Sequence, residues 1–218
     1  MTRVIIADDH PLVREGLKHI LSDCHDIDFA DEVDNGLDLL TKLRLESYDI
    51  VLLDLFMPGK SGLELIKQIK SEFPKLTILI LSTHKEDMYA LRTLKAGASG
   101  YLCKDYAASA LVDAIRKVAS GGRYISPTVA ELLANEFHRP QSDVLPHSLL
   151  SDREYQIFLL IASGVSSTEI AAQLNLSAKT VSTHKTRIKE KTKLINTSEF
   201  VRYAIKNGLI SSDEEYLI

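Results

Sequence analysis

One stretch, from Asp49 to Gly59, constrains the fold of this chain more than any other. Residues 50–55 are apolar apart from Asp54 and do not alternate with polar residues, which predicts a strand buried on both faces. A carboxylate in such a run is costly unless it is paired or hydrogen-bonded. Ligands of open α/β sheets bind at the carboxyl ends of the strands, so Asp54 is a candidate site residue. The alternative is that Asp54 only caps the loop after the strand.

Strand and helix patterns alternate five times over residues 1–122. Apolar runs predict strands at 4–7, 27–33, 49–55, 77–81 and 100–104; amphipathic periods predict helices from Pro11 onward, at 36–45, around 63–69, at 87–96 and at 107–119. This alternation predicts a five-stranded, doubly wound parallel sheet of the flavodoxin-like type, with helices on both faces.

Polar residues follow four of these strands. Asp8 and Asp9 come after the first strand, Asp54 ends the third, Ser82 follows the fourth and Lys104 ends the fifth. The carboxyl ends of parallel strands share one edge, so we expect these five side chains to meet there. Three close carboxylates repel one another unless a cation neutralises them, and oxygen ligands favour Mg²⁺. A lysine and a hydroxyl beside that ion suit a phosphoryl group.

The segment from residue 148 onward is predicted to be all helix. Ser151 and Glu154 form a capping box for the first helix, Ser167 opens the second, and Ser177 caps a third over 178–192. A fourth helix is expected at about 198–207. Two short helices joined by a tight turn, followed by a polar and basic helix, predict a helix-turn-helix.

The third of these helices carries a basic stripe in a chain whose net charge is −4. Residues 178–193 hold six basic side chains against Glu190 alone, an asymmetry that points to nucleic acid. Val181 and Ile188 should face the core, and the opposite face holds Lys179, Ser182, Thr183, Thr186 and Lys189. The alternative is a solvated charged face.

Residues 123–147 are predicted to be a linker with a short helix that starts at Ser126-Pro127. The segment 139–143, with Pro146 after it, has the composition of a mobile linker.

Six histidines show no ligand spacing and are interpreted as scattered surface residues: His10, His19, His25, His84, His138 and His147. The two cysteines also lack metal-ligand spacing. With no apolar run of membrane-spanning length and no signal-peptide pattern, we expect a cytoplasmic protein that does not bind membranes.

Residues 1–122 resemble the receiver domains of two-component response regulators. The resemblance lies in Asp8-Asp9, in Asp54 with Met57-Pro58-Gly59, in Ser82, and in Tyr101 three residues before Lys104. One departure is Asp105, where many receivers carry proline; the subfamily identified below often lacks that proline too.

The receiver resemblance implies a role for each of these residues. Asp54 would accept a phosphoryl group from a sensor histidine kinase. Asp9, Asp54 and the main-chain carbonyl of Phe56 would bind Mg²⁺, with Asp8 acting mostly through water. Ser82 and Lys104 would contact the phosphoryl oxygens, and Tyr101 would turn inward as Ser82 moves. Tyr101 as plain core is the alternative.

The C-terminal segment, 148–218, resembles the LuxR-type DNA-binding domain. The matching residues are Leu150-Ser151, Arg153-Glu154, Glu169-Ile170-Ala171, Leu176-Ser177 and Lys179-Thr180-Val181 with His184. Together the two resemblances identify the chain as a member of the NarL/FixJ class of response regulators. They imply base contacts from Ser182, Thr183 and Thr186, phosphate contacts from Lys179, Thr180, Lys185 and Lys189, and a dimer helix with Phe200, Val201, Ala204 and Ile205. For His184 we expect packing or capping.

These features predict a phosphorylation-controlled transcription factor that forms a homodimer on double-stranded DNA when it is phosphorylated. It would catalyse only its own phosphorylation and dephosphorylation. An aspartate-nucleophile phosphatase is the first alternative, but such enzymes need a second aspartate two residues on, where Phe56 stands. A phosphate-independent or RNA-binding regulator is the second; the acid pair with Ser82 and Lys104 and the helix-turn-helix speak against it.

Overall fold

A computed structural model describes residues 1–57, 62–83, 86–138, 145–174 and 176–210. The chain divides into two compact units, Met1–Ala134 and Asn135–Ile218. Four sequence features lie outside the described residues: the Pro58-Gly59 turn, His84, the linker segment 139–143 and the acidic side chains at 213–215.

The first unit is built on a five-stranded parallel sheet with the strand order β2-β1-β3-β4-β5. The strands are β1 Thr2–Ala7, β2 Ile27–Val33, β3 Ile50–Asp54, β4 Thr77–Ser82 and β5 Gly100–Cys103. Every residue of β3 is buried, Asp54 included. The predicted doubly wound sheet is confirmed, and the absence of alternation in β3 follows from burial on both faces.

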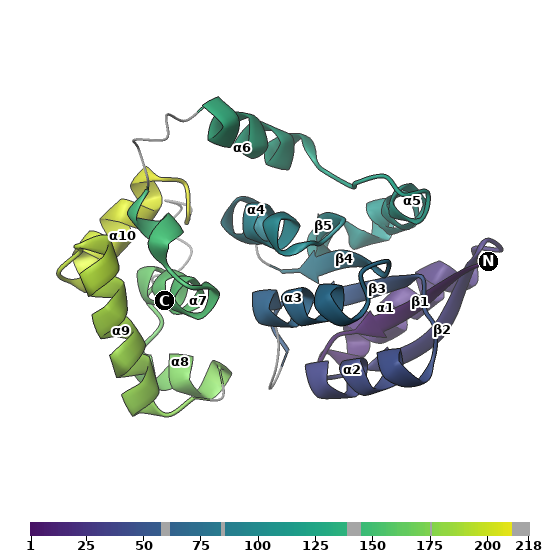
Figure 1. The fold of residues 1–218 in the computed structure, drawn as a ribbon, viewed down its shortest axis with the longest axis horizontal. Coiled ribbons are helices and arrows are strands. Elements are labelled where there is room, and N and C mark those ends of the chain that lie inside the picture. Colours follow the sequence, from purple (N-terminus) through teal and green to yellow (C-terminus); the bar gives the residue numbers. More distant parts are fainter. Residues whose placement is uncertain (58–61, 84–85, 139–144, 175, 211–218) are drawn as a thin grey trace. The chain divides into compact units, whose positions relative to one another are not determined.

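Helices cover both faces of this sheet (Figure 1). They are α1 Pro11–Ser22, α2 Gly36–Leu45, α3 Gly62–Glu72, α4 Glu86–Ala96 and α5 Ala107–Ala119, the last preceded by a short 3-10 turn, η1 Lys104–Tyr106. The α1 and α5 helices contact each other and share one core with every second residue of the central strands, such as Ile50 and Leu52. The intervening residues, such as Val51 and Leu53, are equally buried on the other face.

The strand register aligns the carboxyl ends of the three strands that carry the candidate site. Asp54 of β3 pairs with Leu81 of β4, and the next residue, Ser82, pairs with Cys103 of β5. Lys104 follows Cys103 directly. The sheet therefore brings Asp54, Ser82 and Lys104 to one edge, although they span fifty positions of sequence.

The second unit is helical. It contains η2 Pro146–Leu149, α7 Asp152–Ala162, α8 Ser167–Gln173, α9 Ala178–Thr192 and α10 Thr197–Lys206, and α6 Pro127–His138 spans the boundary between the units. The capping box of Ser151 and Glu154 is present as predicted. Ser167 is the first residue of α8, but the cap is Ser166, which forms a second capping box with Glu169.

His147 packs against helices of the second unit. His147 Nδ1 lies 2.9 Å from the Tyr203 hydroxyl of α10, and its ring centre is 6.0 Å from that of Tyr155 in α7. The interpretation of His147 as a scattered surface residue was therefore wrong, while the linker limits 123–147 stay a prediction. Pro146 starts a 3-10 turn that packs this histidine against the helices.

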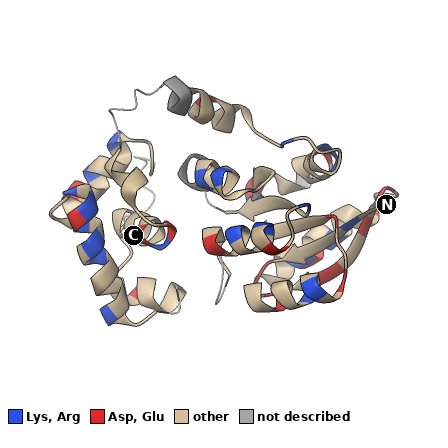
Figure 2. Cartoon of the chain, viewed as in Figure 1, with Lys and Arg blue, Asp and Glu red and all other residues tan. Residues whose placement is uncertain are grey.

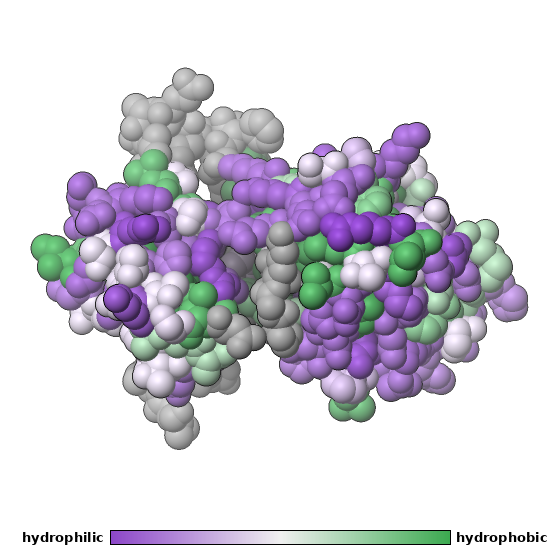
Figure 3. Space-filling model, turned by 60° about the horizontal axis from the view of Figure 1, so that its bottom comes forward, coloured by the Kyte–Doolittle hydropathy of each residue, from purple (hydrophilic) through white to green (hydrophobic). Residues whose placement is uncertain are grey.

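Hydrophobic side chains are mostly internal. On the face drawn in Figure 3 they form small separate areas within a mainly hydrophilic surface. Within the described part of the chain, no helix is both long enough and apolar enough to cross a membrane.

Candidate functional site

Asp8, Asp54 and Lys104 meet at the carboxyl edge of the sheet. Lys104 Nζ lies 2.6 Å from Asp8 Oδ2 and 2.8 Å from Asp54 Oδ2. Asp8 is 1% exposed and Asp54 3% exposed, so these ion pairs are shielded from water. The Asp8 backbone is held from α1, because Arg14 Nη1 donates to its carbonyl oxygen at 2.6 Å. Three residues predicted from separate strand ends are thus brought together.

The charges in this cluster do not balance. Burial raises the pKa of the Asp54 carboxyl against the lowering effect of Lys104, and the neighbouring Asp8 raises it further. Burial alone would lower the pKa of Lys104, but the carboxylates of Asp54 and Asp8 raise it overall, so the ammonium stays charged. One lysine therefore faces several carboxylates, and the site favours an additional cation.

The donor set fits a divalent cation. Asp8, Asp9, His10 and Asp54 each offer one ligand atom, and these atoms all lie within 4.8 Å of one another. Asp9 Oδ1 is buried, and His10 Nδ1 lies 2.9 Å from it, so both atoms are close enough to share an ion. Carboxylate oxygens are the ligands that Mg²⁺ prefers, so the residues present fit this ion.

The loop after β3 orients the Asp54 carboxylate. The Phe56 backbone N–H donates to Asp54 Oδ1 at 3.1 Å, which leaves Oδ2 to face Lys104. The Phe56 ring packs edge-on against Tyr89 of α4, with ring centres 5.1 Å apart. Coordination of an ion by the Phe56 carbonyl stays a prediction.

Ser82 and Tyr101 occupy buried positions near this edge. Ser82 is fully buried at the end of β4, and Tyr101 of β5 is 1% exposed. The tyrosine ring is therefore inside the protein, which suits both the predicted inward state and a plain core residue. The roles of the two residues in signalling stay predictions.

His10 is a site residue that the sequence interpretation missed. Its Nδ1 lies 2.9 Å from Asp9 Oδ1, 3.1 Å from Asp8 Oδ1 and 3.9 Å from Asp54 Oδ2. His10 is exposed, as expected, but it is not a scattered surface histidine. The signal available in the sequence was its place directly after the acid pair, in the loop between β1 and α1.

The candidate nucleic-acid interface is the outer face of α9. Val181 and Ile188 are fully buried, as predicted, and anchor the helix to its unit. The residues with predicted DNA contacts all retain some exposure: Lys179, Ser182, Thr183 and Thr186 are exposed, and Thr180, Lys185 and Lys189 are half-buried. Figure 2 shows the lysine and arginine residues along α9.

The hydroxyls on this face are bonded within their own helix. Thr183 Oγ1 donates to the Lys179 carbonyl at 3.0 Å, and Thr186 Oγ1 donates to the Ser182 carbonyl at 3.2 Å. Each oxygen keeps acceptor capacity toward a base or a water. Because a hydroxyl can pair with several bases, this face does not specify one operator.

An ion pair fixes α9 to α7. Lys191 Nζ lies 2.6 Å from Oε2 of Glu154, whose side chain is 4% exposed and also accepts the Ser151 backbone N–H at 2.8 Å. Burial alone would raise the pKa of Glu154, but Lys191 and Ser151 lower it overall. His184 of α9 is half-buried, and its Nδ1 has no hydrogen-bond partner among the described residues. The residue that caps α9 is Ser177, so His184 has the packing role and not the capping role.

The predictions for the dimer helix need a correction at two positions. Phe200 and Ala204 of α10 are fully buried, and the Phe200 ring centre is 5.4 Å from that of Phe158 in α7. They are core residues, because their four-residue spacing follows the inner face of the helix. Of the four residues, only Val201 and Ile205 are accessible to a partner, and Ile205 is 41% exposed.

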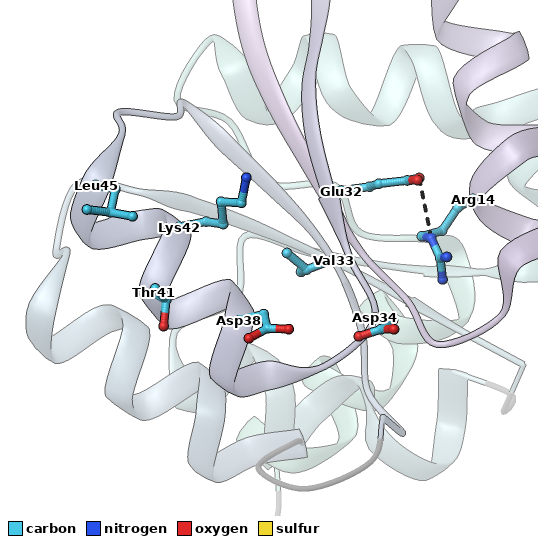
Figure 4. A pocket seen from close by; sticks show the side chains of 8 residues that line it. All are labelled: Arg14, Glu32, Val33, Asp34, Asp38, Thr41, Lys42 and Leu45. Carbon is cyan, nitrogen blue, oxygen red and sulfur yellow. Dashed lines mark ion pairs between the residues drawn. The ribbon is translucent and has the colours of Figure 1, made fainter.

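A surface pocket of about 360 Å³ lies between α1, β2 and α2 (Figure 4). Its lining is Arg14, Glu32, Val33, Asp34, Asp38, Thr41, Lys42 and Leu45. Arg14 Nε lies 3.3 Å from Glu32 Oε2, and Lys42 Nζ lies 2.6 Å from Asp31 Oδ2 beside the pocket. These basic groups are already paired, so the pocket is a weak candidate for an anion site.

Two protein families match this chain. Residues 4–116 match the response regulator receiver domain, and residues 148–204 match the luxR family of bacterial regulatory proteins. Response regulator UvrY of Escherichia coli strain K12 is 38% identical over 213 residues, covering 98% of each chain. Response regulator GacA of Pseudomonas viridiflava is 37% identical over 212 residues, covering 97% of this chain and 99% of the relative.

Solved structures agree with these relatives. RcsB from Salmonella typhimurium is 29% identical with a TM-score of 0.70, covering 94% of this chain and 98% of that one. RcsB from Salmonella enterica serovar Typhimurium, bound to promoter rprA with the phosphomimetic BeF3-, is 29% identical with a TM-score of 0.65, covering 93% and 98%. Fold and sequence thus define a two-component signalling regulator with a DNA-binding domain. This chain belongs to the NarL/FixJ class of response regulators, with a receiver domain followed by a LuxR-type helix-turn-helix domain.

Proposed function

We propose that Asp54 accepts a phosphoryl group from a sensor histidine kinase in a Mg²⁺-dependent step. The observation that carries this proposal is the meeting of Asp8, Asp54 and Lys104 at one edge, with Lys104 Nζ 2.8 Å from Asp54 Oδ2. Asp9 and Asp54, with Asp8 through water, would hold the ion, which supplies positive charge for the transferring phosphoryl oxygens.

The chain's own residues would hold the phosphoryl group after transfer. The Phe56 N–H holds Asp54 Oδ1, so Oδ2 would attack the phosphorus while the bond between phosphorus and the kinase's histidine nitrogen breaks. The Lys104 ammonium, now shared by Asp8 and Asp54, would pair with the phosphoryl oxygens, and Ser82 would donate to them. Phosphorylation adds about −1.5 to −2 of charge at this edge. Movement of Ser82 and Lys104 toward this charge, with Tyr101 turned inward, would report it to the rest of the receiver.

We infer that the phosphorylated receiver promotes a homodimer that binds double-stranded DNA through α9. The solved RcsB relative is bound to a promoter in the presence of a phosphomimetic. By analogy, Ser182, Thr183 and Thr186 would face base edges, while Lys179, Thr180, Lys185 and Lys189 would contact phosphates. Val201 and Ile205 would contribute to the dimer surface of α10. We propose domain limits of 1–122 and 148–218, and a cytoplasmic location.

DNA affinity before and after phosphorylation tests this proposal. A preferred duplex is first selected from random DNA with the full chain, Mg²⁺ and a small phosphodonor. Affinity for that duplex should rise when the phosphodonor is present, and the Asp54→Ala variant should not respond. Equal affinity with and without the phosphodonor in a protein that is demonstrably phosphorylated would contradict the proposed control.

A further inference from the structure

We infer that His10 is a nitrogen ligand of the cation site. With this ligand the site binds transition ions such as Co²⁺ and Ni²⁺ more tightly, relative to Mg²⁺, than a site made of the carboxylates alone. The inference rests on the proposed function, because it concerns the ion that Asp9 and Asp54 hold. His10 follows the acid pair directly in the sequence, and the structure places its Nδ1 among the carboxylate oxygens of Asp8, Asp9 and Asp54.

The separations between donor atoms match those around a bound ion. An octahedral ion with bonds of about 2.1 Å separates neighbouring ligands by about 3.0 Å and opposite ligands by about 4.2 Å. His10 Nδ1 lies 2.9 Å from Asp9 Oδ1 and 3.1 Å from Asp8 Oδ1, which are the separations of neighbouring ligands. The 3.9 Å separation from Asp54 Oδ2 falls between the two values. The same separations fit hydrogen bonds from Nδ1 to the carboxylates, one of which is formed with Asp8 Oδ1. The imidazole therefore lies where a bond to an ion would replace such a hydrogen bond.

The backbone holds His10 in this position, and its side chain is not used to cap the helix that follows. Asp8 Oδ1 accepts the His10 backbone N–H at 2.9 Å, and Pro11 starts α1 directly after it. His10 is the N-cap residue of α1, yet its side chain makes no capping hydrogen bond. The side chain is 60% exposed, so an incoming ion can reach it without unfolding the loop.

A nitrogen ligand changes which ions the site prefers. Imidazole suits Ni²⁺, Zn²⁺ and similar ions, whereas carboxylates and water suit Mg²⁺. Removal of His10 should therefore lower Co²⁺ and Ni²⁺ affinity and leave Mg²⁺ affinity nearly unchanged. The alternative is that Nδ1 only hydrogen-bonds the carboxylates, in which case its removal would affect every ion in the same way.

Calorimetric titration of the untagged full chain with Mg²⁺, Co²⁺ and Ni²⁺ distinguishes these outcomes. We expect His10→Ala to weaken Co²⁺ and Ni²⁺ binding by about tenfold or more, to change Mg²⁺ binding little, and to alter the visible absorption spectrum of bound Co²⁺. His19→Ala, at an exposed histidine of α1, is the matched control and should behave as wild type.

Three results would overturn the inference: equal weakening for all three ions, no weakening for any, or an unchanged Co²⁺ spectrum. Asp54→Ala separates this failure from failure of the proposed function. If Asp54→Ala loses Mg²⁺ binding while His10→Ala behaves as wild type, only the role of His10 is wrong. If Asp54→Ala binds Mg²⁺ normally, the proposed cation site itself is wrong.

Discussion

Lys104 Nζ lies 2.8 Å from Asp54 Oδ2, joining two buried side chains that are fifty positions apart in the sequence. The parallel register of β3, β4 and β5 makes this contact, because it places the ends of the three strands side by side. The same lysine also pairs with Asp8, so it is shared between two carboxylates. A lysine shared by two carboxylates can leave one of them and pair with the oxygens of a phosphoryl group added to Asp54. A sensor of phosphorylation needs such a movable cation.

Lys104→Gln should destabilise the receiver when no divalent ion is present. The substitution leaves Asp8 and Asp54 buried without their cation, and breaking such a pair costs about 3–5 kcal/mol. Added Mg²⁺ should restore part of the loss, because it supplies the missing charge. Denaturant unfolding in EDTA and in Mg²⁺, followed by circular dichroism, measures both effects.

Lys42→Gln is the matched control for that prediction. Lys42 pairs with Asp31 at 2.6 Å, but its side chain is 41% exposed, and exposed pairs contribute about 0–1 kcal/mol. If Lys104→Gln proves as stable as Lys42→Gln in EDTA, the cluster is not short of positive charge and the electrostatic account of the site fails.

Glu154→Gln should destabilise the helix-turn-helix unit more than Glu169→Gln does. Both residues close a capping box, but only Glu154 is buried and paired with Lys191. In Glu154→Gln the charged hydrogen bond to Lys191 is lost, which costs about 1.5–3 kcal/mol. In Glu169→Gln the glutamine can still accept the backbone N–H of the exposed capping box, so little is lost. Denaturant unfolding at pH 7 compares the two variants, and similar losses would disprove a special role for the Lys191 pair.

The cost of Glu154→Gln should also depend on pH. The pKa of Glu154 is lowered in the folded protein from an ordinary value of 4.5. Its ionised form therefore stabilises the fold fully above pH 4.5, and this contribution is lost as the pH falls through the lower folded pKa. Unfolding free energies measured from pH 7 to pH 3 should converge for wild type and Glu154→Gln; a gap that stays constant would contradict the pKa direction.

Thr183→Ala and Lys185→Ala should affect DNA binding in different ways. Thr183 is exposed on the outer face of α9, where a hydroxyl can pair with a base, so its loss should change the relative affinity for different duplexes. Lys185→Ala should weaken binding to all duplexes alike and reduce the salt slope by about 1. Affinities for a panel of duplexes over a range of salt provide the measurement. Uniform effects from both variants would exclude Thr183 from base recognition.

Ile205→Lys should weaken dimer formation on DNA without unfolding the protein. Ile205 is 41% exposed on α10, so a charge there costs little in the monomer but is buried by a partner. Sedimentation of the phosphorylated protein with a two-site duplex should show fewer dimers, while Lys206→Gln, at an exposed neighbour, should behave as wild type. Undiminished dimers with Ile205→Lys would remove α10 from the interface.

The sequence predicts the architecture well because its patterns follow directly from burial. The unbroken apolar run of β3 reflects a strand covered on both faces, and acids or a lysine at strand ends show where polar side chains can reach solvent or ligand. The spacing of Val181 and Ile188 identifies the inner face of α9 for the same reason. Ser166 was also within reach, because Ser166 and Glu169 have the spacing of a capping box.

Other features depend on three-dimensional contacts that have no local pattern. The contact of His147 with Tyr203 joins residues 56 positions apart, and the approach of His10 to Asp54 joins the loop after β1 to the end of β3. The resemblance to the LuxR-type domain predicts a dimer helix that includes Phe200 and Ala204, but a resemblance does not show which residues of that helix face the core. Here the inner face of the helix contacts Phe158 of the same unit.

Intact mass measurement after incubation with Mg²⁺ and a small phosphodonor tests the central claim most directly. We predict that the wild-type chain gains one phosphoryl group, that removal of Mg²⁺ with EDTA prevents the gain, and that Asp54→Ala gains none. A phosphoryl group that is still added to Asp54→Ala would contradict the assignment of Asp54, and addition that is equally fast in EDTA would contradict the cation site.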